Sequence, residues 1–345
     1  MPTDTTHPLK LGGGYGSPYS LKMRAVLRYR RIPYTWVLRD SRWDDLPPVP
    51  VRLIPVIAFP DADGNYAEAQ IDSSPLIERL ETMYSGRSLV PTDPAVAFID
   101  HLIEDYGDEW VTKAMYHYRW YYDDAIDKAG SLLPLDHDLQ MSAERWAKAK
   151  AFVTDRQIGR RALVGSTEQN RPIIEQSYLR LLDLLQQHVS VHDFLLGDRP
   201  GCGDFGVFGQ LRQLVGWDPE SARVAVARAP RVVNWVDRTD DLSWWPVDGD
   251  AGWHERDGIA ATTRALLAEI GRTYTPFMLA NAEALDRGAD EVVCTIDGQE
   301  YRQGTFAYQR KCLGWLRDRY AALTADDRRA VDALLAGTGC EPLVR

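Results

Sequence analysis

The sequence has 345 residues, 45% of them hydrophobic, which is enough for a large buried core and about two domains. Its 50 acidic and 40 basic residues leave a net charge of −10 without a long run of Lys or Arg, so nucleic acid is not expected as a partner. No window approaches the roughly 18 consecutive apolar residues of a membrane span, and the N-terminus lacks a signal-peptide core. We expect a cytoplasmic protein that does not associate with membranes.

The cysteines are too few and too scattered for a disulfide framework or a structural zinc site. They lie far apart in the sequence and form no Cys-x-x-Cys pattern: Cys202, Cys294, Cys312 and Cys340. We therefore expect four reduced thiols and no bound metal.

The first 90 residues alternate between strand and helix signals. A strand over 8–13 is followed by a helix that opens at Pro18, where proline suits the first turn. The remaining predicted elements are a strand, two antiparallel strands joined at Asp63-Gly64, and a helix: residues 34–38, 56–59, 66–71 and about 72–84. The expected order is β-α-β, then β-β-α.

Helical periodicity dominates after the proline-rich break at 90–94. Residues 292–296 and 299–303 predict a small hairpin around Asp297-Gly298, and we expect 217–256 to be irregular. The helices are expected at 95–127, 142–160, 172–190, 204–216, 257–270, 276–288, 306–322 and 325–337. A domain boundary is expected near residue 90.

This order of elements resembles the glutathione transferase superfamily, and three motifs carry the resemblance. Ser17-Pro18-Tyr19-Ser20 opens the first helix as Cys-Pro-Tyr-Cys or Ser-Pro-Tyr-Ser turns do in thioredoxin-like proteins. Ile54-Pro55-Val56 precedes the third strand, where the superfamily has a cis-proline, and Asp72-Ser73-Ser74-Pro75-Leu76 resembles its Glu-Ser-x-Ala-Ile motif. The resemblance implies an α/β thioredoxin-like N-terminal domain (1–90) and an all-α C-terminal domain (91–345) with a long extension from about residue 236.

A fourth match departs from the family pattern. The segment 199–205 resembles the family's capped helix start, written Ser-x-x-Asp, but Gly201 stands where the capping serine is expected. Only the Asp204 half of the reciprocal cap is therefore expected.

The resemblance also implies which residues bind a thiol. Pro55 is expected in the cis form, with the Val56 backbone bonded to the thiol peptide, and Asp72 and Ser73 are expected to hold its γ-glutamyl carboxylate. Asp72 is one methylene shorter than the usual glutamate. The thiol is therefore expected to be glutathione or another low-molecular-weight thiol of the cell.

The start of the first helix is the expected catalytic position. A transferase of this type needs its thiol as a thiolate, and a pKa two units lower requires about 2.7 kcal/mol. A helix N-terminus supplies about 0.3–2 kcal/mol and one hydrogen bond to a charged group about 1.5–3 kcal/mol. The Ser17 hydroxyl provides both, with Tyr15 and Ser20 as alternatives, whereas the structural interpretation of Ser17 is a helix cap. With no thiol at 17 or 20, the sequence disfavours a redox enzyme.

An unusually aromatic helix follows the predicted thiol domain. At helical spacing, Trp110, Lys113, His117 and Trp120 share one face, and with Tyr19 they are our candidates for binding the electrophile. The alternative interpretation is that this aromatic stripe packs in the core and that His117 is a hydrogen-bonded structural residue.

The sequence thus predicts a thiol S-transferase of the glutathione transferase type, expected to be a homodimer. Conjugation, substitution, isomerisation and ether cleavage all remain open. The alternative is a non-catalytic binding or scaffold protein that keeps the fold without the chemistry.

Overall fold

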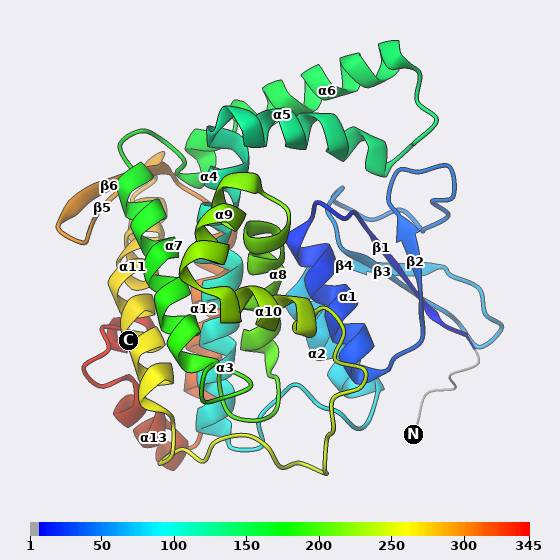
Figure 1. Ribbon diagram of the computed structural model, residues 1–345. Coiled ribbons are helices and arrows are strands. Elements are labelled where there is room, and N and C mark those ends of the chain that lie inside the picture. Colours follow the sequence, from blue (N-terminus) through cyan, green and yellow to red (C-terminus); the bar gives the residue numbers. More distant parts are fainter. Residues whose placement is uncertain (1–6) are drawn as a thin grey trace.

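The computed structural model describes residues 7–345 and places a small sheet beside a larger group of helices (Figure 1). The sheet has the order β2-β1-β3-β4, with β1 parallel to β2 and the other pairs antiparallel. Its strands are β1 (Leu9–Gly13), β2 (Tyr34–Leu38), β3 (Val56–Phe59) and β4 (Glu68–Ile71), joined to α1 (Pro18–Arg30) and α2 (Ser73–Met83). The predicted α/β N-terminal domain followed by a helical domain is confirmed.

The chain between α2 and α3 contains residue 90, the proposed domain boundary. The helices beyond it, together with the predicted hairpin, are α3 (Pro94–Tyr106), a π-helical segment η1 (Gly107–Val111), α4 (Thr112–Tyr121), α5 (Asp123–Leu132), α6 (Ala143–Ile158), α7 (Arg171–His188), α8 (Cys202–Gly216), α9 (Pro219–Arg228), α10 (Pro230–Thr239), α11 (Ala261–Asp286), β5 (Glu291–Ile296), β6 (Gln299–Gly304), α12 (Ala307–Ala322) and α13 (Ala325–Leu335). Three short 3₁₀ turns complete the chain: η2 (Leu133–Asp136), η3 (Arg161–Val164) and η4 (Glu341–Val344).

Three expectations about the helices are wrong. The predicted helix over 95–127 is divided into α3, η1, α4 and α5, and the segment 217–256 contains α9 and α10, each opened by a proline in its first turn. The two helices predicted over 257–270 and 276–288 are one helix of 26 residues, α11, which continues through Pro276. This helix packs against α7, α12 and β5, and burial on several sides outweighs the backbone hydrogen bond that Pro276 cannot donate.

One hydrophobic core extends through both parts of the molecule. It includes Leu11 of β1, Phe205 of α8 and Leu316 of α12, all almost completely buried. The C-terminal extension therefore packs into the same core as the sheet. Among residues 7–345, no helix is long and apolar enough to cross a membrane.

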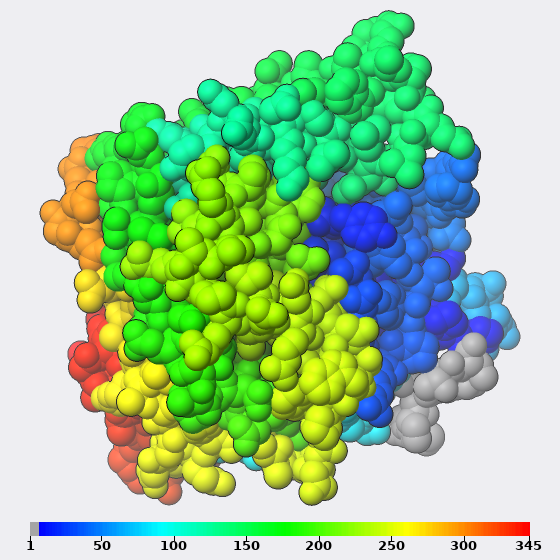
Figure 2. All heavy atoms as spheres, in the orientation of Figure 1, coloured from blue at the N-terminus to red at the C-terminus, as the bar shows by residue number. Residues whose placement is uncertain are grey.

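Helices α5 and α6 overhang the N-terminal domain, seen as the green layer above the blue one in Figure 2. Two hydrogen bonds join this layer to the loop after β2. His137 Nδ1 lies 2.7 Å from the Arg39 carbonyl, and Arg42 donates to Gln140 over 3.2 Å. The overhang thus borders the same end of the sheet as the start of α1.

Candidate active site

Ser17 forms the N-cap of α1. Its backbone is extended (φ −99°, ψ 119°), and its Oγ accepts a hydrogen bond of 3.2 Å from the Ser20 amide. Pro18 follows at the first helical position, where its missing N–H costs nothing. The hydroxyl is half-buried at the positive end of the helix dipole, so the geometry is compatible with both predicted roles, helix cap and thiol activator.

The two alternatives to Ser17 have different surroundings. Ser20 is completely buried, with its Oγ 3.4 Å from the Gly14 amide. The Tyr15 side chain is 45% exposed, and its ring lies 5.7 Å from that of Trp36. Of the three candidates, Ser17 is the one that is both at the helix end and partly accessible.

The predicted cis-proline is present, since the Ile54–Pro55 peptide bond is cis. Val56 begins β3 directly after it and pairs with Gly12 of β1 and Ile71 of β4. The thiol-binding roles of Pro55 and Val56 stay predictions.

The start of α2 leaves its first backbone amides without a side-chain cap. Asp72 occupies the N-cap position with φ +81° and ψ 115°, and its carboxylate makes no hydrogen bond to the helix. Instead, the Tyr308 hydroxyl of α12 donates to Asp72 Oδ2 over 2.8 Å. The free N–H groups of the first turn can therefore receive a ligand carboxylate.

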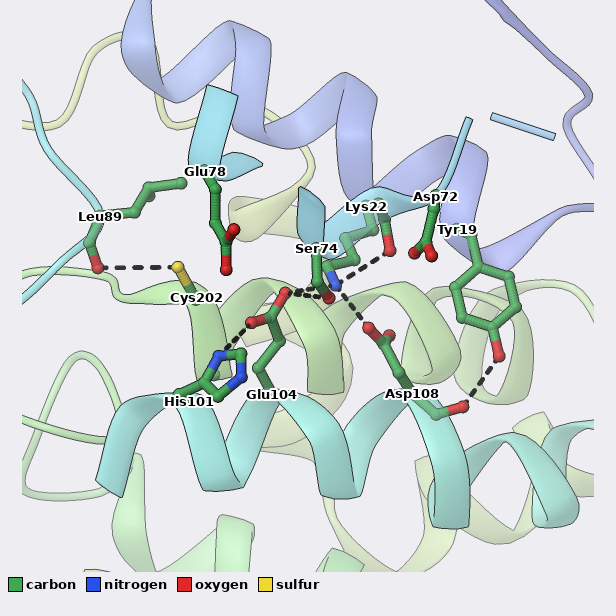
Figure 3. Close-up of polar contacts among 12 residues, drawn as sticks. Tyr19, Lys22, Asp72, Ser74, Glu78, Leu89, His101, Glu104, Asp108 and Cys202 are labelled. Carbon is green, nitrogen blue, oxygen red and sulfur yellow. Dashed lines mark hydrogen bonds and ion pairs between the residues drawn. The ribbon is translucent and has the colours of Figure 1, made fainter. Parts of the chain in front are cut away.

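Ser73 is linked to a buried lysine that the sequence analysis did not single out. Lys22 of α1 is completely buried, and its Nζ lies 3.2 Å from Ser73 Oγ, 2.7 Å from Glu104 Oε1 and 2.5 Å from Asp108 Oδ2 (Figure 3). Glu104 also accepts from Ser74 Oγ (2.9 Å) and contacts His101 Nδ1 (3.1 Å). We call these six residues the lysine cluster: Lys22, Ser73, Ser74, His101, Glu104 and Asp108.

The lysine cluster fixes how the Ser73 hydroxyl can be used. An ammonium group only donates hydrogen bonds, so Ser73 Oγ must be the acceptor in its contact with Lys22. The hydroxyl hydrogen of Ser73 is then available to a ligand. The start of α2 therefore offers an anion two kinds of donor, the free N–H groups of its first turn and this hydroxyl.

Charge in the lysine cluster is unequally divided. Burial raises the pKa of Glu104, but Lys22 and His101 outweigh it and hold this pKa well below its usual range. Burial raises the pKa of Asp108 to about 7 despite Lys22, with the Glu104 charge adding to the effect. Its neighbour Glu109 has a pKa of about 8, raised by burial and then by the charges of Asp105 and Asp108. Glu104 thus stays ionised and balances the charge of Lys22, whereas Asp108 titrates near neutral pH.

Tyr19 connects the two domains. Its hydroxyl donates to the Asp108 carbonyl over 2.8 Å (Figure 3). It also lies 3.3 Å from Thr112 Oγ1. Burial raises its pKa well above the usual value, so the group remains a donor. The predicted substrate role of Tyr19 is untested.

The four other predicted substrate residues lie inside the helical domain, each at most 2% exposed. Trp110 packs on Phe277 and Tyr301 of the extension, and Trp120 is buried on α4. His117 lies between Ser166 Oγ (2.9 Å) and Glu175 Oε1 (3.3 Å). Their burial supports the alternative interpretation that the stripe packs in the core.

Lys113 is enclosed with this stripe. Its Nζ donates to Gln303 Oε1 of β6 over 2.6 Å and lies 3.9 Å from the centre of the Phe277 ring. Burial lowers its pKa to about 7. The helical domain nevertheless reaches the start of α1, because the buried Arg119 of α4 donates to the Gly16 carbonyl (2.6 Å) while paired with Asp218 (2.8 Å).

Two family models match the sequence in the order of the two structural parts. Residues 11–88 match the glutathione S-transferase N-terminal domain, and residues 151–238 match the glutathione S-transferase C-terminal domain. The chain belongs to the glutathione transferase superfamily. Residues 89–150 and 239–345 lie outside the two matched segments, and the extension from about residue 236 stays a prediction.

Several solved structures of glutathione transferases are partly similar to this superfamily member. A GST-like protein from Pseudomonas syringae is 16% identical, with 68% of this chain and 67% of that chain covered and a TM-score of 0.43. A glutathione transferase from Burkholderia graminis, solved with two glutathione molecules per subunit, is 20% identical (70% and 90% covered, TM-score 0.41). A beta-etherase from Sphingobium sp. is 16% identical (67% and 93% covered, TM-score 0.41). The sequence matches no curated protein.

Proposed function

We propose that this glutathione transferase superfamily member is a thiol S-transferase that binds glutathione or a related cellular thiol and activates it as a thiolate. The observation that carries the proposal is the half-buried Ser17 hydroxyl at the N-terminus of α1, which is followed along the chain by the cis Ile54–Pro55 bond and by the uncapped start of α2. We define the thiol site as Ser17, Pro55, Val56, Asp72 and Ser73.

The thiol site offers a partner for each end of an amino-acid group. The N–H groups in the first turn of α2 and the Ser73 hydroxyl favour a carboxylate. The second oxygen of Asp72 favours an ammonium group. This pairing supports glutathione, whose glutamyl end carries both groups, over a thiol that lacks them.

The sulfur would then be activated at α1. Ser17 donates its hydroxyl hydrogen to the thiolate, and the dipole of α1 adds to the preference for negative charge. The thiolate attacks an electrophilic carbon of the second substrate. Conjugation, substitution, isomerisation and ether cleavage all begin with this nucleophile. The proposal extends to a cytoplasmic location and to a homodimer, and size-exclusion chromatography tests the homodimer.

The first prediction concerns the pKa of bound glutathione. The Ser17→Ala variant loses a hydrogen bond to a charged group, about 1.5–3 kcal/mol, so the pKa of the bound thiol rises by about one to two units. Ultraviolet absorbance of the thiolate, followed against pH in the complex, measures this without knowledge of the electrophile.

A matched control separates this effect from loss of a helix cap. Ser142 caps α6 by accepting from the Arg145 amide over 3.3 Å, so Ser142→Ala removes a similar cap elsewhere. Both variants lose about 1 kcal/mol of stability, but only Ser17→Ala changes the thiol pKa. An unchanged pKa in Ser17→Ala moves the catalytic role to Tyr15 or Ser20, and failure to bind glutathione or other cellular thiols favours the scaffold alternative.

A further inference from the structure

Helix α12 of the extension reaches the proposed thiol site. Tyr308, in its first turn, donates its hydroxyl to Asp72 Oδ2 over 2.8 Å, although the two residues are 236 positions apart. The matched family segments end at residue 238, so this contact comes from a part of the chain outside them. An added segment thus contacts a residue of the proposed thiol site directly.

Several contacts hold α12 in this position. Gln309 Nε2 donates to the Glu109 carbonyl of η1 over 3.3 Å, and Arg319 pairs with Glu78 of α2. The Tyr308 ring packs edge-on against Trp315, with the ring centres 6.2 Å apart. The position of the Tyr308 hydroxyl is therefore set by α2 and η1 together.

The hydrogen bond constrains a residue with an unfavourable backbone. Asp72 has φ +81° and ψ 115°, a conformation that L-residues seldom adopt and that persists where neighbouring groups enforce it. Burial raises the pKa of Tyr308 well above its usual value, so its hydroxyl stays protonated and donates. Tyr308 thereby orients the Asp72 carboxylate and leaves Oδ1 open.

The Asp72 carboxylate itself favours a cation. Tyr308 occupies Oδ2, and Oδ1 can accept a hydrogen bond from an ammonium group at the start of α2. The negative charge of the carboxylate attracts such a group.

We propose that Tyr308 is a specificity-determining residue, which orients Asp72 to accept a hydrogen bond from the α-ammonium group of a glutamyl thiol. This inference rests on the proposed function of the thiol site. It assigns part of the extension to thiol selection.

The test compares two ligands on the full-length protein by isothermal titration calorimetry. One is glutathione, and the other is glutathione without its α-amino group. Tyr308→Phe removes the donor and keeps the ring, so glutathione is expected to bind about tenfold more weakly, whereas the affinity for the deaminated ligand changes less than about twofold.

A matched control is available on the same helix. Tyr320 donates to Asp332 Oδ1 over 2.8 Å, and Tyr320→Phe removes a similar bond far along α12 without an expected effect on either ligand. Equal weakening of both ligands by Tyr308→Phe, no weakening, or tighter binding would each overturn the inference. If the wild-type protein binds neither glutathione nor another cellular thiol, the proposed function fails first and the inference with it. If it binds another cellular thiol but not glutathione, the inference alone is overturned.

Discussion

At the scale of single residues, the lysine cluster links charge to stability. Lys22 faces two carboxylates, and the pKa of Asp108 is raised to about 7 by burial. In an unfolded chain an aspartate has a pKa of about 3.9, so between about pH 4 and 7 the folded state holds a proton that the unfolded state releases. Stability contributed by protonated Asp108 is therefore lost as pH rises through this window.

We expect Asp108→Asn to weaken this pH dependence. The amide is neutral at every pH and its oxygen can still accept from Lys22, so the variant gains stability relative to wild type between pH 5 and about 7.5. Urea unfolding at several pH values measures the difference. Asp124→Asn, at an exposed position of α5, controls for the loss of one carboxylate.

A parallel decrease of stability at all pH values would contradict this expectation, since it would mean that folded Asp108 is ionised and needed as the partner of Lys22.

The sequence could predict the positions of Ser17, the cis Pro55 and the start of α2, because each depends on a local motif. The lysine cluster could not be found in the same way. Lys22 is separated from Glu104 and Asp108 by 82 and 86 residues, so only the tertiary fold, which lets the Lys22 side chain reach α3 and η1, brings the charges together. The local signals, a lysine on an otherwise apolar helix face and two acids at i,i+4, are common on exposed helices.

At the scale of elements, the start of α8 shows how the missing cap serine is replaced. Asp204 Oδ2 accepts from the Gly201 amide over 3.0 Å, which confirms the predicted half of the cap. The other half comes from Asp100 of α3, whose carboxylate accepts from the Cys202 and Gly203 amides (2.8 and 2.9 Å). A cap from another helix thus fixes α8 against α3.

Restoring the family serine is therefore expected to destabilise the protein. A Cβ atom at Gly201 would lie 2.2 Å from Asp100 Oδ1, so Gly201→Ser displaces the carboxylate that caps the helix. We expect the free energy of unfolding to fall by about 1–3 kcal/mol, measured by chemical denaturation.

Gly314→Ser on α12 provides the control, because no heavy atom lies within 4 Å of a Cβ added there. A Gly201→Ser variant as stable as this control would show that Asp100 can move without cost.

Element boundaries were predictable where the chain carries its own stop signals. Helices α6, α7, α12 and α13 lie within two residues of their expected bounds at every end, whereas α11 continues through Pro276. The division at η1 depends on tertiary packing, since a Cβ at Gly107 would lie 2.6 Å from the α8 backbone at Gly206. The periodicity of apolar residues does not indicate that the backbones of two helices will lie this close together.

At the scale of the whole molecule, the extension completes the core of the helical domain. Trp110 has its ring 5.9 Å from Phe277 and 5.8 Å from Tyr301, and Lys113 is bonded to Gln303. Removal of these partners would expose a large aromatic surface and a lysine whose buried contacts depend on them.

We therefore expect a chain ended at residue 238 to lose native packing, although both family models lie within it. Near-ultraviolet circular dichroism and binding of a hydrophobic dye measure the loss. A soluble truncated protein with the native aromatic spectrum would show that the extension is an independent addition.

The ion pairs of Lys22 have a consequence for how this chain can be recombined with its relatives. A chimera that takes its first 90 residues from a relative without a lysine at this position would bury Glu104 and Asp108 with no positive charge from α1. The two segments are thus compatible only as a pair. Among proteins descended from this chain, positions 22, 104 and 108 would have to change together, so substitutions in the two domains would be correlated at these three positions.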